Sequence, residues 1–574
     1  MTWVQGRSKT SLARGWFFLF CNRVNKKKFE LHGRPFVAVF RGALWFLCSF
    51  LVSSPLLRAD ETRPTGQTMP NAPDVAIESE ERFDVWEYQV EGNTLLPSKD
   101  IERTVYSYLG PGKSIKDVEA ARGQLEQRYR DGGYGTVLVD IPEQDVAEGV
   151  VRLKVTEGKV SRLRVTGSRY FSLGRIKAQV PALAEGQVPD LPKVQEQLNA
   201  LNQATGDRQV TPVLRPGTTP GTLEVDLQVK DEFPLHGDLT LNDRYTPDTT
   251  RLRLNASLRY DNLWQKEHSL AINYQVSPQD PGEVQVFSGT YLFRIPDSDK
   301  LLTFYGVVSE SDVAAVGTLA VIGQGTMAGV RGTIPLTAQE DYFHSLTLGA
   351  DYKDFDESVL LGTDTLNTPI DYLSFLSEYN ATWTGENSAT RFGVGVHFAF
   401  RGLGNTEAEF DDKRLGARPN FLYLTLHGEH SREWLAGTTL FARFDGQWSD
   451  APLVSNEQMS AGGVESVRGY LESEVLADDG FTGTLEIRSP SYARVWDKLQ
   501  TLEFSTFVDG GWLRLQDPLP DQDADFSLLS TGLGMELLAR RDLSAALFWA
   551  WPFMEAGTVR PGESRVHFEL GYTF

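Results

Sequence analysis

The second half of the chain is dominated by short segments in which apolar and polar residues alternate. RFGVGVHFAF at 391–400 and RVHFELGYTF at 565–574 are examples, and turn residues or polar loops separate such segments from Leu235 onward. A period of two is typical of strands, and each segment is about as long as a tilted strand that crosses a bilayer. Roughly 340 residues, at about twenty per strand and connection, predict on the order of sixteen strands. We therefore predict a membrane all-β fold at 233–574, an antiparallel transmembrane β-barrel. A soluble all-β array is the alternative, and it is disfavoured because the segments are longer than typical soluble strands.

The last of these segments has one wholly apolar face. Phe568, Leu570, Tyr572 and Phe574 alternate with polar residues or glycine, so their side chains share one side of a strand. The pattern resembles the terminal strand signal by which bacterial outer-membrane barrels are recognised for insertion. It implies a location in the bacterial outer membrane, with the barrel assembly machinery and outer-membrane lipid as partners.

Ahead of this region the pattern mixes helical and strand periods, and it occurs twice. VEGN at 90–93 and VTGS at 165–168 hold equivalent places in two units, 83–157 and 158–232, each with a strand, two helical stretches and two strands. The second helix of each unit repeats apolar residues at helical spacing, which predicts that it covers one face of a small three-stranded sheet. These residues are Val118, Ala121, Leu125 and Tyr129 in the first unit, and Val194, Leu198 and Leu201 in the second.

This repeated order resembles the POTRA domain, a periplasmic module that binds extended polypeptide segments. We therefore expect two small α+β POTRA-like domains in front of the barrel. A sheet edge in such a domain can be completed by an incoming unfolded strand through main-chain hydrogen bonds that depend little on sequence.

The N-terminal region has the order of a secretory signal peptide. Basic residues crowd the first forty positions, an apolar run follows at 43–52, and a cleavage site is expected near Ala59. We predict a signal peptide with a long basic lead at 1–59 and an extended, proline-containing linker at 60–82. A signal anchor is the alternative, and the run is short for a membrane span. The two cysteines of the chain lie in the expected signal segment, so the mature protein would contain none.

Composition and motifs exclude several classes of function. A formal net charge of -21 argues against nucleic acid as a partner, because phosphate neutralisation needs a basic face. The chain has no phosphate-binding loop, no HExxH and no GxSxG. We therefore predict that the protein is not an enzyme and binds no cofactor or metal. Gly393 and Gly395 fall in a predicted strand and not in a dinucleotide loop. The carboxylate pairs at 411–412 and 478–479 are interpreted as solvated loop charges.

One segment points to a family. The sequence GGVESVRGY at 462–470 looks like the GG-x-x-SVRGY signature of two-partner secretion transporters, the haemolysin secretion/activation (ShlB/FhaC-like, TpsB) family, and FVDGG at 507–511 looks like its F-x-D-x-G strand motif. The resemblance implies that the loop of the first motif folds back into the barrel lumen, where Arg468 meets Asp509 on the wall. An arginine suits this role because its planar fork matches a carboxylate. A solvated loop charge is the alternative for Arg468. The candidate residues are Gly462, Gly463, Ser466, Val467, Arg468, Gly469 and Tyr470 in the loop, and Phe507, Asp509 and Gly511 on the wall.

Many members of this family begin with a helix that plugs the pore. The segment at 60–82 is short and broken by prolines, so we expect that helix to be missing or reduced. The loop that carries Arg468 would then close the pore. The resemblance implies ATP-independent export of a large secreted exoprotein, of haemolysin or adhesin type. Two alternatives stay open at this stage, an assembly factor that inserts other barrels and an outer-membrane hydrolase or plain porin.

Overall fold

The computed structural model describes most of the chain from residue 81 to the C-terminus. The described range is 81–574, with gaps at 248, 297, 312, 317–318, 323, 340, 357, 362–363, 494–498, 521 and 541. The expected signal peptide at 1–59, nearly all of the linker at 60–82 and any plug helix therefore lie outside the described residues. Within them, helices are too short or too polar to cross a bilayer.

The first module is a three-stranded sheet covered by helices. The strand order is β2-β5-β4, with β2 parallel and β4 antiparallel to β5, and β1 and β3 form a separate pair. Ser114 and Asp117 form a capping box that starts the long helix α4, whose predicted apolar face is buried. The elements are β1 (Phe83–Val85), β2 (Glu87–Glu91), α3 (Ser98–Val105), β3 (Gly110–Lys113), α4 (Ile115–Asp131), β4 (Val137–Asp140) and β5 (Val150–Glu157).

The second module repeats this topology. Its sheet order is β6-β8-β7, again with one parallel and one antiparallel pair. The repeat extends to the backbone, because Gly92 and Gly167 have φ angles of 87° and 89°. A Cβ added to either would lie 2.3 Å from a carbonyl oxygen, that of Val155 or Val229 respectively, so both places require glycine. The elements are β6 (Lys159–Thr166), α5 (Leu173–Ala178), α6 (Leu191–Gln203), β7 (Arg208–Pro216) and β8 (Thr222–Asp231).

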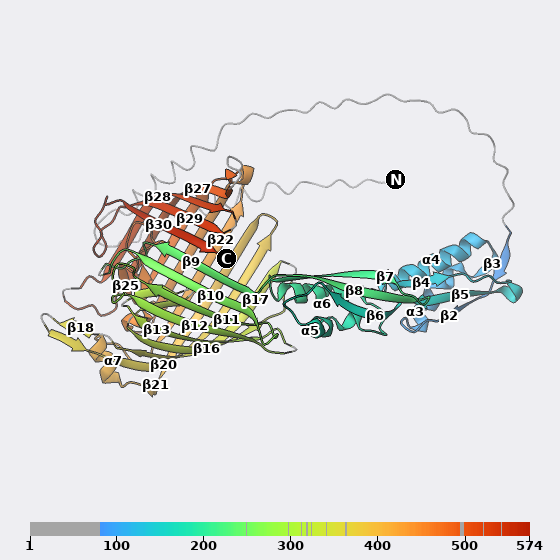
Figure 1. Ribbon diagram of the computed structural model, residues 1–574, viewed down its shortest axis with the longest axis horizontal. Helices are drawn as coiled ribbons and strands as arrows, with labels where there is room; N and C mark the ends of the chain where they lie inside the picture. The colour runs from blue at the N-terminus through green and yellow to red at the C-terminus, as the bar shows by residue number, and fades with distance from the viewer. Residues whose placement is uncertain are drawn as a thin grey trace, which may run out of the picture. The chain divides into compact units, whose positions relative to one another are not determined.

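The rest of the chain confirms the predicted barrel. Sixteen strands, all antiparallel to their neighbours, close into one sheet in which β30 returns to pair with β9 (Figure 1). The strands are β9 (Leu235–Asn242), β10 (Arg253–Leu263), β11 (His268–Val276), β12 (Gln285–Arg294), β13 (Leu301–Glu310), β16 (Gly325–Pro335), β17 (Tyr342–Phe355), β20 (Ile370–Gly385), β21 (Ser388–Gly404), β22 (Leu422–Glu433), β23 (Thr439–Ser449), β26 (Asp479–Arg488), β27 (Leu499–Arg514), β28 (Asp525–Ala539), β29 (Leu543–Pro552) and β30 (Arg565–Thr573).

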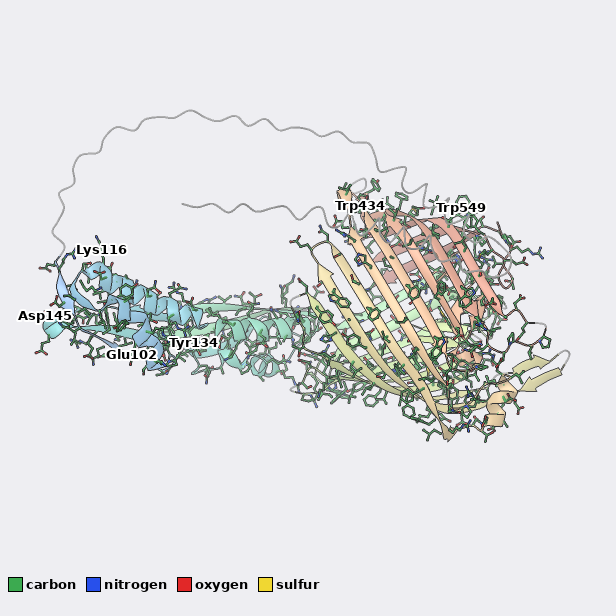
Figure 2. The ribbon with its side chains drawn as sticks, turned by 180° about the vertical axis from the view of Figure 1, so that it is seen from behind. Glu102, Lys116, Tyr134, Asp145, Trp434 and Trp549 are labelled. Atoms are coloured by element: carbon green, nitrogen blue, oxygen red, sulfur yellow. The ribbon has the colours of Figure 1, made fainter. Side chains whose placement is uncertain are left out.

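The barrel strands turn apolar side chains outward. On β22, Leu422, Leu424 and Leu426 are exposed, whereas the alternate residue Tyr423 is buried. Tryptophans on the outside include Trp434 and Trp549, whose side chains are labelled in Figure 2. An apolar outer surface with aromatic residues is what a lipid-facing barrel requires. Shorter elements lie in the connections: the hairpins β14 (Val313–Val316) with β15 (Leu319–Ile322), β18 (Ser358–Leu361) with β19 (Asp364–Asn367) and β24 (Met459–Ala461) with β25 (Val475–Ala477), and the helix α7 (Glu407–Lys413).

The C-terminal residues close the barrel. Phe574 and Gly237 exchange two backbone hydrogen bonds, of 3.0 and 2.9 Å, just beyond the β9–β30 ladder. The Phe574 ring occupies the space where a Gly237 side chain would otherwise lie. Leu570, Tyr572 and Phe574 are exposed on the outer surface, whereas His567 is buried on the other face of β30. The alternation in the last segment therefore separates lipid-facing from lumen-facing side chains.

The second module contacts a turn between two barrel strands through a buried ion pair. Arg208, at the start of β7, places Nη1 2.7 Å from Oε1 of Glu267 in the turn between β10 and β11. Its Nη2 also donates to the carbonyl oxygen of Leu201, and its guanidinium lies over the ring of Phe171. A buried arginine with these partners fixes the turn to the module.

Candidate functional site

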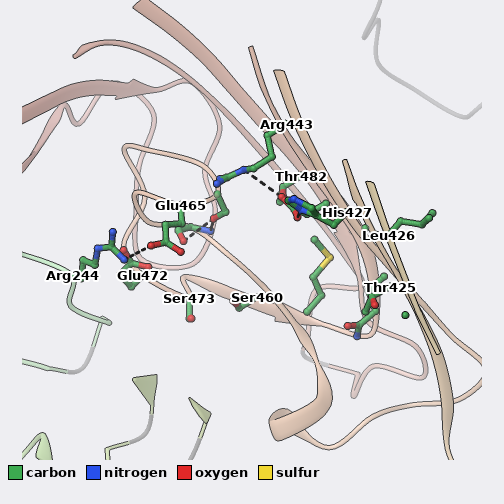
Figure 3. A pocket seen from close by; sticks show the side chains of 18 of the residues that line it. Arg244, Thr425, Leu426, His427, Arg443, Ser460, Glu465, Glu472, Ser473 and Thr482 are labelled. Carbon is green, nitrogen blue, oxygen red and sulfur yellow. Dashed lines mark hydrogen bonds and ion pairs between the residues drawn. The ribbon is translucent and has the colours of Figure 1, made fainter. Parts of the chain in front are cut away.

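The connection between β23 and β26 folds into the barrel. It contains the short hairpin β24–β25, and the tip between these two strands, which we call the lumenal loop, covers residues 462–474. The tip contacts inward-facing residues of β26, β27, β29 and β30. Figure 3 shows part of the loop beside the barrel wall. The loop of the GG-x-x-SVRGY motif therefore lies inside the lumen.

Arg468 lies at the centre of these contacts. Its Nε donates to Oδ2 of Asp509 at 2.8 Å and its Nη2 donates to Oδ1 at 2.9 Å, while its backbone N–H donates to Oδ2 at 3.1 Å. Arg468 is 5% exposed and Asp509 is fully buried. Asp509 points inward because it shares the lumenal face of β27 with Phe507 and Gly511. The structure thus joins the two residues in a bidentate, buried ion pair.

A second carboxylate, which the sequence reasoning missed, binds the same guanidinium. Glu486 on β26 accepts from Arg468 Nη1 at 2.8 Å and also from Nε of Arg488 at 2.8 Å. The guanidinium carbon of Arg468 lies 3.4 Å from the ring centroid of Phe507, a cation–π contact. The alternation of GTLEIRSP placed Glu486 on the lumenal face, and that is the signal by which it could have been found.

The residues after Arg468 fit the wall closely. Gly469 has a φ of 95°, and its backbone N–H donates to His567 Nε2 on β30 at 3.2 Å. A Cβ at Gly469 would lie 3.2 Å from Cβ of Ala550, so both the backbone angle and the available space favour glycine. Tyr470 is fully buried, and its hydroxyl donates to the carbonyl oxygen of Met554 at 2.8 Å.

The residues before Arg468 shape the tip. Gly462 and Gly463 have positive φ angles of 113° and 94°. Ser466 Oγ bonds both the N–H and the carbonyl oxygen of Gly462 at 2.8 Å, which closes a tight turn. Val467 is fully buried, and its Cγ2 lies 3.6 Å from the position of a Cβ added to Gly511. Of the candidate loop residues, Val467 and Arg468 therefore lie against the candidate wall residues, whereas Gly462, Gly463 and Ser466 shape the loop itself.

Buried carboxylates hold the two legs of the loop, the segments that lead into and out of its tip. Glu457, on the leg that enters the lumen, accepts from the hydroxyls of Tyr372 at 2.6 Å and Tyr423 at 2.8 Å, and pairs with Lys353 at 2.5 Å. These partners come from β20, β22 and β17. The entering leg is thus fixed to three strands of the wall.

Asp478, on the returning leg, corrects one interpretation of the sequence. It was interpreted as a solvated loop charge, but it is fully buried. Both of its oxygens bind Arg414, and it also accepts from the backbone N–H groups of Leu453 and Gln516 at 2.8 Å. The interpretation was wrong because Arg414 lies 64 residues away in the sequence and meets Asp478 only when the connection folds into the barrel. Asp411 and Asp412, the other pair, are exposed.

Beside the loop lies a cavity of about 510 Å³ with a charged lining. Arg244, Arg443, Glu465 and Glu472 are among the residues around it (Figure 3). Gly393 and Gly395, which lie in strand β21 as predicted, also line it. Burial raises the pKa of Glu472, a loop residue, to about 7, although the positive charge of Arg244 acts in the opposite direction.

One group of side chains in the described ranges has atoms close enough together to ligate a metal ion. Asp207, His236 and Asp261 have ligand atoms within 4.8 Å of one another. Each already has a partner, since His236 Nε2 lies 2.9 Å from Asp207 and Arg259 Nε lies 2.8 Å from Asp261. These ion pairs account for the arrangement without an ion, and the absence of a metal or cofactor stays a prediction.

Comparison with known proteins gives matches to both parts of the chain. Residues 83–158 match the POTRA domain of ShlB type, and residues 221–537 match the family described as haemolysin secretion/activation protein ShlB/FhaC/HecB. The outer membrane transporter CdiB of Dickeya dadantii (strain 3937) is 24% identical over 511 residues, which cover 86% of this chain and 87% of that protein.

Solved structures share the fold. CdiB from Escherichia coli superposes with a TM-score of 0.59 at 19% sequence identity, over 96% of this chain and 100% of that chain. BamA from Haemophilus ducreyi lacking POTRA domains 1-3 superposes with a TM-score of 0.53 at 14% identity, over 86% of this chain and 100% of that chain. At these identities the two structures bear on the fold alone.

Proposed function

The chain belongs to the haemolysin secretion/activation protein family of ShlB, FhaC and HecB, and from this premise we propose how it acts as a two-partner secretion transporter of the outer membrane. Members of this family export a partner exoprotein. In our proposal the modules capture the unfolded exoprotein in the periplasm, the barrel passes it outward, and the lumenal loop closes the pore between export events.

The observation that carries this proposal is the way in which the lumenal loop is held. The tip depends on one arginine, Arg468, between two wall carboxylates, and the legs depend on Glu457 and Asp478. Ion pairs and hydrogen bonds within a protein can be exchanged for hydrogen bonds to water when they break, and a charged cavity lies beside the loop. The loop is therefore held firmly enough to block the lumen and reversibly enough to be displaced by a passing chain.

Capture is assigned to the first module, because its strand β2 offers a sheet edge. Three other edges in the described modules are covered. On the β4 edge, the carbonyl oxygen of Val139 accepts a hydrogen bond from the Arg122 side chain. On the β6 edge, the backbone of Val160 forms hydrogen bonds with the loop at 184–187. On the β7 edge, the Asn202 side chain bonds the backbone of Val210. Strand β2 has only β5 as a ladder partner among the described residues. An extended exoprotein segment can add to β2 by main-chain hydrogen bonds.

The remaining partners follow from the surfaces of the barrel. The outward apolar face fits outer-membrane lipid, and the terminal strand with Phe568, Leu570, Tyr572 and Phe574 fits recognition by the barrel assembly machinery. The exoprotein is large and of haemolysin or adhesin type. Residues 1–59 direct export and are removed, and residues 60–82 link the mature N-terminus to the first module. No ATP is consumed, and nucleic acid is not a partner, in keeping with the net charge of -21.

A barrel assembly factor is the second candidate, because BamA shares the fold. The two-module arrangement and the GG-x-x-SVRGY motif favour secretion. The experiment is coexpression of the chain with candidate exoproteins of haemolysin or adhesin type, with exoprotein measured in the medium and unrelated barrels measured in the membrane. Export to the medium supports the proposal. Depletion of the chain that lowers other barrels without affecting exoprotein export would favour the assembly factor instead.

A further inference from the structure

The joint between the first and last barrel strands is short. β30 pairs with β9 through five residue pairs, from Asp238↔Thr573 to Asn242↔Glu569, whereas β9 forms eight pairs with β10. Beyond Asn242 and Glu569 the ladder stops, although both segments continue side by side. We call this joint the closing seam. Its far end needs contacts other than backbone pairing to stay together.

Side chains supply those contacts. The backbone N–H of Phe568 donates to Oδ1 of Asp243 at 2.8 Å, and Arg565 Nη1 donates to the hydroxyl of Tyr245 at 2.7 Å. Arg244 reaches across with Nη2 3.5 Å from Oε2 of Glu569. Asp243 is 2% exposed, so the far end of the seam is a packed junction and not an open gap.

The lumenal loop contacts both sides of this junction. On the β9 side, Arg244 pairs with Glu465 of the loop, as the dashed line in Figure 3 shows, and the N–H of Glu472 donates to the carbonyl oxygen of Tyr245 at 3.1 Å. On the β30 side, the N–H of Gly469 donates to His567 Nε2. His567 is 3% exposed, and its Nδ1 lies 3.6 Å from Asp243. One loop therefore bonds two strands whose own pairing has already ended.

We propose that the lumenal loop is also a strap across the closing seam, with Arg244 and His567 as the residues that position it there. The loop is anchored to β26 and β27 through Arg468, so that it links the far wall to both seam strands at once. When the loop leaves its place, the far end of the seam loses three of its contacts and opens. Docking of the loop and closure of the seam are therefore coupled, and each makes the other more favourable.

The test measures the seam directly, with no exoprotein present. Leu241 on β9 and Ala545 on β29 both pair with Leu570 of β30, one residue pair from the far end of the seam, and both share the lipid-facing side of the wall with that exposed leucine. Nitroxide labels at these two positions flank β30, about 10 Å apart across two strand spacings, and leave the terminal strand unchanged. Because residues 60–574 contain no cysteine, Leu241→Cys and Ala545→Cys label only these sites.

In the labelled parent we expect strong dipolar broadening in the electron paramagnetic resonance spectrum. Arg244→Ala should remove much of the broadening, and Glu465→Ala, which breaks the same pair from the loop, should do the same if Arg244→Ala fails to assemble. The matched control is Arg391→Ala, which breaks a wall ion pair with Glu429 on β21 and β22. It should leave the spectrum unchanged.

Unchanged broadening in Glu465→Ala would overturn the strap whatever Arg244→Ala shows, because Arg244 also contacts Glu569 directly across the seam and its loss can open the seam without the loop. Broadening that is lost equally in Arg391→Ala would overturn it too, because the seam would respond to any weakened wall pair. Since the measurement needs no export, its failure leaves the proposed transport function standing, and a loss of export alone leaves the strap standing.

Discussion

Arg468→Ala should release the lumenal loop and impair export. The substitution removes every bond that the guanidinium makes, to Asp509 at 2.8 and 2.9 Å and to Glu486 at 2.8 Å, and leaves two carboxylates in a buried place. Breaking a buried pair by removing one partner costs about 3–5 kcal/mol. The docked loop should lose at least that much, which corresponds to a shift of more than about a hundredfold toward the released loop.

Asp509→Ala should be milder, because Glu486 still holds Arg468. Asp509→Glu should be milder again, since the carboxylate is kept and only its reach changes. The double variant Arg468→Ala/Asp509→Ala should be scarcely worse than Arg468→Ala, because partners in one buried network are not additive. Arg468→Lys keeps the charge but not the two-pronged geometry, so we expect partial function.

The assay is exoprotein in the medium per folded barrel in the outer membrane, together with single-channel conductance in a planar bilayer. Arg468→Ala should lower the first and raise the frequency of large openings in the second. Arg391→Ala is the control, because its ion pair with Glu429 is exposed and worth little. Normal export by both single variants, or a strictly additive loss in the double variant, would refute the proposal that the Arg468–Asp509 ion pair holds the loop. Arg468 would then be an ordinary loop charge.

Three further predictions address other parts of the molecule. Phe574→Ser should reduce heat-modifiable barrel in a gel-shift assay, because it removes about 1.5–3 kcal/mol of apolar contact from the closing strand, and an unchanged band would contradict this. The raised pKa of Glu472, about 7 against an ordinary 4.5, means that the docked loop binds a proton more readily than the released loop. Docking is therefore favoured at low pH and weakened as the pH rises through about 7, so channel openings should be more frequent above about pH 7 than near pH 5, and Glu472→Gln should abolish that dependence. Arg208→Ala should destabilise the second module against the barrel by about 3–5 kcal/mol, because Glu267 stays buried without its partner. Arg164→Ala, which breaks an exposed pair, should have a much smaller effect in the same urea titration or limited proteolysis.

The parts of the fold with a strong period were predictable. Alternation from Leu235 onward gave the barrel and its strand number, because a membrane strand must face lipid on one side and the lumen on the other. The repeated helical spacing gave both modules, and Gly92 and Gly167 show why the repeat is visible in sequence: the same backbone approach requires glycine twice.

The partners within the lumen were less predictable. Arg468 and Asp509 could be named only through a resemblance to a family, and Glu486 was missed although its strand was recognised. Asp478 was misread because an isolated acidic pair in a polar connection has no local sign of its partner, Arg414. Which inward-facing residues a loop meets is decided by strand register and by the depth to which the loop enters, and neither follows from local periodicity.

The most direct test of the account is a reversible tether between the lumenal loop and the wall. Val467→Cys and Gly511→Cys place two sulfurs where the native side chain already lies 3.6 Å from the wall position, in a mature chain with no other cysteine. Each single cysteine serves as the control for barrel assembly and export. If the loop must move for export, oxidation should stop release of the exoprotein by the double variant and a reductant should restore it. Undiminished export through a barrel whose loop is shown to be disulfide-tethered would contradict the account.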